Sequence, residues 1–87
     1  MNVSDYPTLK PRQVLAMLKR VGYQQVRQKG SHRRLEADDR PPVTLAYHDG
    51  SDVPRIALRK LLEKQIGLSE AEIRDLLEGR RMRSGKE

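Results

Sequence analysis

The chain has 87 residues, a formal net charge of +6 and no cysteine. These features exclude disulfides and thiolate-bound zinc, and no apolar run approaches the roughly 18 residues of a membrane span. The strongly basic balance favours a nucleic acid or an acidic protein as partner. We therefore expect a single small domain over residues 1–87, cytoplasmic and without a signal peptide or membrane segment.

The N-terminal third is predicted to be a lead-in followed by a helix. Residues 1–8 are largely polar and are expected to form a loose lead-in. Pro11 suits the first turn of a helix, because its missing N–H is not needed there, and Gly22 supplies a C-terminal stop. Between them, apolar residues recur with the spacing of one buried helical face: Val14, Leu15, Leu18 and Val21.

Three strands are predicted next. Residues 23–29 and 32–37 carry β-compatible residues on either side of a tight Gly30-Ser31 turn. Residues 38–42 have the chemistry of a second turn, and residues 43–47 form the clearest strand. Its inward face is expected to consist of Val43, Leu45 and Tyr47.

Two helices and a tail complete the chain. Pro54 opens the second helix and Gly67 ends it, with an apolar set of Ile56, Leu58, Leu61, Leu62 and Ile66. Ser69 and Glu72 have the spacing of a capping box before a short third helix with Ile73, Leu76 and Leu77. The core is expected over about residues 9–78, with a flexible basic tail over 79–87.

The order of elements predicts an α+β fold in which a three-stranded antiparallel sheet carries helices on one face. If Leu35 faces the helices, then His32, Arg34 and Glu36 point away from them. The same alternation puts Thr44, Ala46 and His48 on the outer face, with His48 opposite or diagonal to His32 if the turn contains no bulge. A one-residue slip would reverse these faces.

His32 is the candidate catalytic residue. The ordinary pKa of a histidine, about 6.5, lets it exchange a proton near neutrality, and here it lies within a dense group of cations. RNA cleavage without a metal needs a base for the 2′-hydroxyl proton, cations for the phosphorane and a donor for the leaving oxygen. Candidate RNA- and phosphate-binding residues surround His32: Arg27, Lys29, Ser31, Arg33 and Arg34. His48 or a lysine is a candidate auxiliary acid.

Each of these residues also has a simpler interpretation. His32 can be a solvated or structural histidine, and His48, beside Asp49-Gly50, can be a turn residue. Ser31 is better explained by the turn than by a nucleophilic role. Two histidines without cysteine make a poor metal set, and no glycine-rich phosphate loop is present, so we expect no metal and no cofactor.

Several motifs of this sequence resemble the HicA/YcfA-like toxins, small mRNA interferases of type II toxin–antitoxin systems. The most specific is Arg27-Gln28-Lys29-Gly30-Ser31-His32. Val26 and Arg33, on either side of this motif, belong to the same run. The others are Leu9-Lys10-Pro11-Arg12-Gln13-Val14, Leu18, Gly22-Tyr23, His48-Asp49-Gly50, Pro54, Leu58-Arg59 and Gly67-Leu68-Ser69. The resemblance covers about residues 9–77. The 38–42 turn and the basic tail are not required by the family pattern.

The resemblance implies a double-stranded-RNA-binding-like α-β-β-β-α fold and cleavage of mRNA that arrests translation. It maps the family's catalytic histidine onto His32. It also implies a HicB-type antitoxin that masks the site, through an acidic surface if charge complementarity guides the contact.

Two other functions remain open at this point. The protein can be a non-catalytic RNA-binding module of the same fold, with His32 only packing or contacting phosphate. Alternatively, its basic face can serve an acidic protein partner alone. The first hypothesis predicts a cleavage activity that depends on His32; the others predict none.

Overall fold

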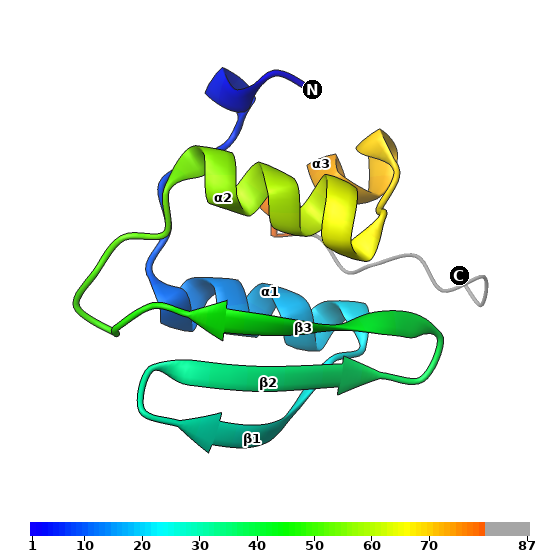
Figure 1. Cartoon of the computed structure of the whole chain (residues 1–87). Helices are drawn as coiled ribbons and strands as arrows, with labels where there is room; N and C mark the ends of the chain where they lie inside the picture. Colours follow the sequence, from blue (N-terminus) through cyan, green and yellow to red (C-terminus); the bar gives the residue numbers. More distant parts are fainter. Residues whose placement is uncertain (80–87) are drawn as a thin grey trace.

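A helix, three antiparallel strands and a C-terminal group of helices follow one another in the computed structural model, which describes residues 1–79 (Figure 1). Their bounds are η1 (Val3–Asp5), α1 (Pro11–Val21), β1 (Gln24–Lys29), β2 (His32–Ala37), β3 (Arg40–Ala46), α2 (Arg55–Arg59), η2 (Lys60–Ile66) and α3 (Glu70–Leu77). This arrangement confirms the predicted α+β class and the α-β-β-β-α order with an added C-terminal helix. The predicted tail lies, apart from Gly79, outside the described residues.

The helices begin and end where the sequence indicates. Pro11 occupies the first turn of α1, and Gly22 ends it in the left-handed region at φ 110°. α2 follows Pro54 and runs directly into the π-helical turns of η2, which end at Gly67. In the capping box of α3, Ser69 and Glu72 exchange hydrogen bonds of 3.1 and 2.9 Å.

Ile56 is the exception on the second helix, because its side chain is 56% exposed and not part of the core. Leu58 and Leu62 are fully buried on the same helical run. Ile56 precedes Leu58 by two residues, a rotation of about 200° around a helix, so the two side chains face opposite ways. The prediction that Ile56 belongs to the buried apolar set is therefore wrong.

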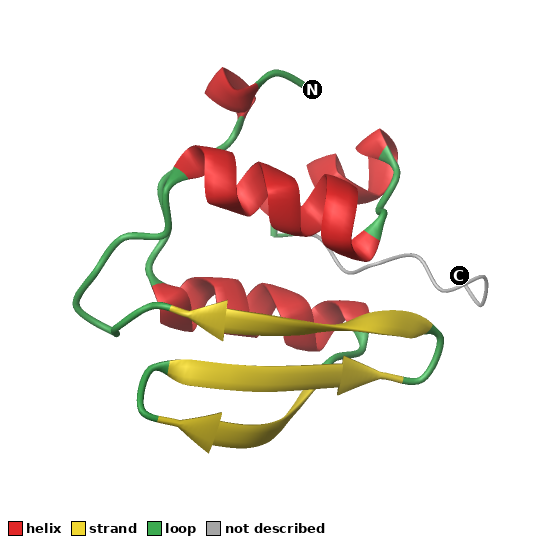
Figure 2. Ribbon diagram, viewed as in Figure 1, coloured by secondary structure: helices red, strands yellow, loops and turns green. Residues whose placement is uncertain are grey.

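The sheet has the strand order β1-β2-β3 (Figure 2), and the apolar side chains of β2 and β3 belong to the core on its helix-facing side. Leu35, Val43 and Leu45 are each at most 3% exposed, as predicted. The second turn is shorter than expected: only Asp38 and Asp39 separate β2 from β3, and residues 40–42 already belong to the strand. Pro41 and Pro42 are compatible with β3 because it is an edge strand, where proline is tolerated.

The short turn changes the strand register without changing the faces. A five-residue turn without a bulge would pair His32 with His48, whereas the observed partner is Ala46. A register shift between Leu35 and Ala37 compensates for the shorter turn. Because the pairing has moved by two residues, side chains of β2 stay on the faces predicted for them.

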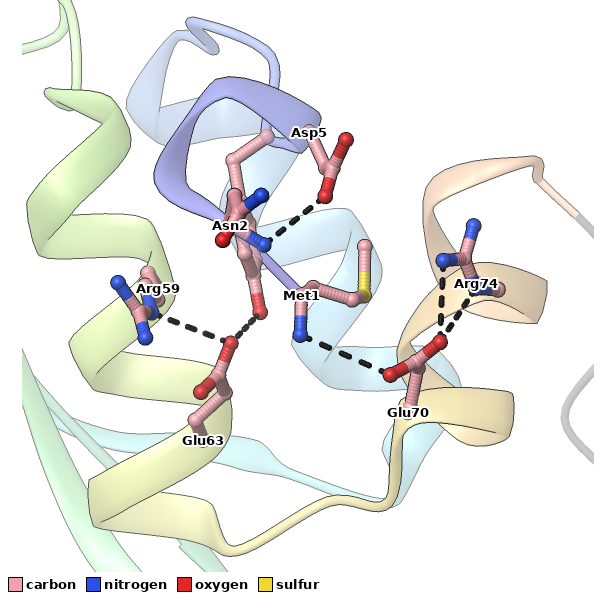
Figure 3. A network of polar contacts seen from close by, with 8 residues as sticks. Met1, Asn2, Asp5, Arg59, Glu63, Glu70 and Arg74 are labelled. Atoms are coloured by element: carbon pink, nitrogen blue, oxygen red, sulfur yellow. Dashed lines mark hydrogen bonds and ion pairs between the residues drawn. The ribbon is translucent and has the colours of Figure 1, made fainter.

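The N-terminal segment is ordered against the helices, so the predicted loose lead-in is wrong. Tyr6 is 1% exposed and belongs to the core, where burying an aromatic ring of this size is strongly favourable. Its hydroxyl donates a hydrogen bond to the carboxylate of Glu63, which also pairs with Nε of Arg59 at 3.4 Å (Figure 3). Further along, the N–H of Val53 donates to the carbonyl of Leu9 at 2.7 Å.

Candidate functional site

The outer face of the sheet, opposite the helices, carries His32 in a row with basic neighbours. Lys29 pairs directly with His32 across the first hairpin, and Ala46 pairs with His32 on the other side. All three side chains are exposed. Directly opposed residues of an antiparallel pair share a face, with Cβ atoms about 5 Å apart. Lys29 and His32 are therefore neighbouring residues on one surface.

The next row on the same face adds two guanidinium groups. Arg27 pairs with Arg34, which in turn pairs with Thr44, and all three are exposed. The carboxylate of Glu36, also on this face, lies 3.3 Å from Nε of Arg34. We call Arg27, Lys29, His32 and Arg34 the basic sheet face. Clustered cations of this kind create a positive potential that attracts polyanions.

A β-bulge at Val26 is what brings Arg27 and Lys29 onto this face. Gln25 pairs with the core residue Leu35, and a regular strand would therefore direct Arg27 toward the helix side as well. The register shifts between Gln25 and Arg27, so that Arg27 opposes the outward-facing Arg34. Bulges re-aim side chains in this way.

The turn before His32 depends on Gly30. Only Gly30 and Ser31 separate Lys29 from His32, and Gly30 has φ 60° whereas Ser31 does not have a positive φ. Glycine with positive φ at the first central position is the pattern of a type II′ hairpin turn. The carbonyl of Gly30 accepts a hydrogen bond of 3.1 Å from the side-chain amide of Gln28. Ser31 is half-buried within this turn.

Arg33 does not join the basic sheet face. It pairs with Leu45 on the helix-facing side, is 7% exposed, and forms an ion pair through Nη2 with Oδ1 of Asp49. Its Nη1 is buried without a hydrogen-bond partner. The structure thus separates Arg33 from the other sequence-predicted phosphate ligands. The alternation of β2 already contains this signal, because Arg33 has the parity of Leu35.

Two ion pairs connect the loop that carries His48 to the rest of the fold. Asp49 pairs with Arg33 from β2, and Asp52 lies 2.7 Å from Nζ of Lys10, at the start of α1. Within the loop, the N–H of Ser51 donates to the carbonyl of His48 at 2.9 Å. His48 is exposed and lies two residues beyond Ala46, where β3 has ended, so sheet pairing does not determine the direction of its side chain.

No three His, Asp or Glu side chains within residues 1–79 gather as a metal site. None of the helices in these residues is both long and apolar enough to cross a membrane.

Comparison with known protein families gives a match over most of the fold. The family model described as HicA toxin of bacterial toxin-antitoxin matches residues 11–68, which include α1, all three strands, α2 and η2. No curated protein and no solved structure matches significantly. The matched region covers well over half of the 87 residues. A toxin of this kind has a cognate antitoxin as partner, and the chain belongs to the HicA toxin family of bacterial toxin–antitoxin systems.

Proposed function

We propose that this toxin is a metal-independent endoribonuclease that cleaves mRNA in the cytoplasm and so arrests translation, with His32 as its catalytic residue. The observation that carries the proposal is the basic sheet face, on which an exposed histidine is paired with Lys29 and flanked by Arg27 and Arg34. This arrangement combines a proton-transfer group with fixed cations.

In the proposed reaction, His32 removes the proton of a 2′-hydroxyl group. The 2′-oxygen forms a bond to the adjacent phosphorus, and the bond from phosphorus to the 5′-oxygen breaks. The products are a 2′,3′-cyclic phosphate and a 5′-hydroxyl end. The proton required by the leaving 5′-oxygen comes from Lys29, directly opposite His32, or from His48 as an auxiliary acid.

The cations have distinct proposed roles. Lys29, Arg27 and Arg34 stabilise the charge that develops on the phosphorane, an effect that is strong when the groups are fixed in advance. Ser31 is proposed to contact phosphate from the turn. Arg33 is assigned a different role, because its buried side chain holds the loop of Asp49 and lies on the other face of the sheet.

The cognate antitoxin is proposed to be of the HicB type and to mask His32 with acidic side chains. Complementary charge at the rim of such an interface would speed association and exclude RNA at the same time. A complex in which His32 stays open to solvent would contradict this arrangement.

The test is cleavage of a long single-stranded RNA in the presence of EDTA by the wild type and by His32→Ala. We expect the variant to lose about 10²–10⁴-fold in rate while it keeps its melting temperature and most of its RNA affinity. Gln24→Ala, an exposed change at the far end of the same face, is the matched control and should cleave normally. RNA binding without cleavage by the wild type would instead support a non-catalytic binding module.

A further inference from the structure

A groove of about 480 Å³ runs along the free edge of β3. Four consecutive residues of the chain, 44–47, line one of its walls. Because successive side chains of a strand point to opposite faces, the consecutive lining residues Thr44, Leu45 and Ala46 mean that the edge of β3 itself contributes to this wall, which Tyr47 continues just beyond the strand. Within residues 1–79 the sheet order ends at β3, so no fourth strand covers that edge.

The opposite wall is a helical stripe. Ile56, Ala57, Lys60 and Leu61 line it with the i, i+1, i+4, i+5 spacing of one helix face, together with Val53 and Gln65. Ile56 and Val26 are the two large apolar side chains that remain exposed in the described part of the chain. A single exposed isoleucine is ordinary on a protein surface. Beside an unpaired strand edge, however, Ile56 completes the features of a peptide-binding groove.

The start of β3 limits where pairing can occur. Pro41 and Pro42 have no N–H to donate to a neighbouring strand, whereas each of residues 43–46 has one, and alternate ones point to the free edge. The groove begins at Thr44 and therefore coincides with the part of the edge that can pair.

We propose that this groove binds an extended segment of the cognate antitoxin, which adds to β3 as a fourth strand. Main-chain hydrogen bonds to a free edge supply affinity, and pockets for alternate side chains supply specificity. The alternate side chains facing the helix would be apolar and contact Ile56, Ala57 and Leu61. Lys60 is the charged residue of the lining, and the chain carries a net charge of +6, so acidic side chains are expected on this segment.

The other alternate side chains of the added strand would extend the basic sheet face. Lys29, His32 and Ala46 form one row across the sheet, and the new strand would continue it. With strands about 4.8 Å apart, an acidic residue in that row would lie roughly 10 Å from the β2 position of His32. The existence of the antitoxin follows from the family, whereas the masking of His32 by this strand rests on the proposed function.

The test measures antitoxin affinity by calorimetric titration, with the antitoxin identified as the protein whose co-expression restores growth. We expect Ile56→Asp to weaken binding about tenfold or more, since it places a charge in the centre of the apolar wall. Ala16→Asp is the control: Ala16 is exposed on α1, outside the groove lining and outside the basic sheet face, and its change should leave affinity within about threefold.

A second pair of variants tests the charge of the groove independently of its apolar wall. Lys60→Glu should weaken antitoxin binding about tenfold, whereas Lys64→Glu, on the same helix but outside the groove lining, should not. Amide hydrogen exchange should also slow in the wild-type complex for those residues among 43–46 whose N–H points to the free edge, because a fourth strand would protect these alternate amides.

Unchanged antitoxin affinity in both Ile56→Asp and Lys60→Glu would overturn the proposal. So would a loss of affinity for a fluorescent single-stranded RNA without a loss of antitoxin affinity, which would assign the groove to nucleic acid. Conversion of a dimer to a monomer by Ile56→Asp, with antitoxin affinity unchanged, would assign it to a second copy of the chain. The titration reads binding alone, so a failure of the proposed nuclease activity leaves this result interpretable.

Discussion

Arg33 and Asp49 form an ion pair that joins the strand carrying His32 to the loop carrying His48. Each member of the pair directly follows one of the two histidines in the sequence. The pair is asymmetric, because the Arg33 side chain is 9% exposed and the Asp49 side chain 61% exposed. The ion pair therefore stabilises the fold mainly because the Asp49 carboxylate compensates the charge of the buried Arg33 guanidinium.

Removing Asp49 should be costly because it leaves a buried cation without its carboxylate. We expect Asp49→Ala to lower the free energy of unfolding by about 1–3 kcal/mol, measured by urea denaturation. Asp52→Ala in the same loop is the matched control, since Asp52 and Lys10 are both about half-exposed and such pairs contribute roughly 0–1 kcal/mol. Arg33→Met combined with Asp49→Ala should recover part of the loss. Equal losses for Asp49→Ala and Asp52→Ala would contradict this account.

Gly30 is predicted to be essential to the geometry of the Lys29–His32 pair. Gly30→Ala places a side chain at φ 60°, where an L-residue is disfavoured by about 1–2 kcal/mol. We expect lower stability in urea denaturation and, under the proposed function, slower RNA cleavage. Gly50→Ala is the control, since Gly50 does not have a positive φ and an added Cβ there meets nothing within 4 Å. Equal losses of stability for Gly30→Ala and Gly50→Ala would contradict the claim that the turn requires glycine at position 30.

The basic sheet face makes a prediction about salt. If Arg27 contacts a phosphate, Arg27→Gln should reduce the slope of log affinity against log salt by about 0.7 for single-stranded RNA. Arg12→Gln is matched in charge but changes an exposed residue of α1, on the other side of the sheet, and should leave the slope unaltered. Fluorescence anisotropy over a range of salt concentrations gives both slopes. A reduced slope for Arg12→Gln alone would place the RNA on the helical side.

Much of the fold follows from local patterns in the sequence. The helix spacing of Val14 and Leu18, the stops at Gly22 and Gly67, and the alternation around Leu35 all correspond to observed features. The local patterns did not predict the register in which the strands pair. The shortened 38–39 turn and the compensating register shift depend on how β2 and β3 associate, and residue types alone do not express that.

The candidate site was predictable to a similar extent. The outward direction of His32 and Arg34 follows from their alternation with Leu35. The direction of Arg27 and Lys29 does not, because it depends on the bulge at Val26, which nothing in the local sequence marks. Asp49 was missed as the partner of Arg33 because the ion pair joins residues 16 positions apart through the fold. The groove beside β3 likewise exists only once the helix and strand are assembled.

The hydrogen bond between Tyr6 and Glu63 leads to a prediction about pH. The burial of Tyr6 was not predicted, because it is a single aromatic residue in an otherwise polar segment. The hydrogen bond from Tyr6, then the nearby Arg59, hold the pKa of Glu63 below its usual range. A carboxylate with a lowered folded-state pKa contributes stability above its unfolded pKa of about 4.3, and this contribution is lost as pH falls through the folded value. We therefore expect the wild type to be more stable than Glu63→Gln in urea denaturation at pH 7, with the difference shrinking toward pH 3. Lys64→Gln, the neighbouring change on η2, should show no such pH dependence. A constant difference between wild type and Glu63→Gln at both pH values would mean that the Glu63 charge does not contribute to folding.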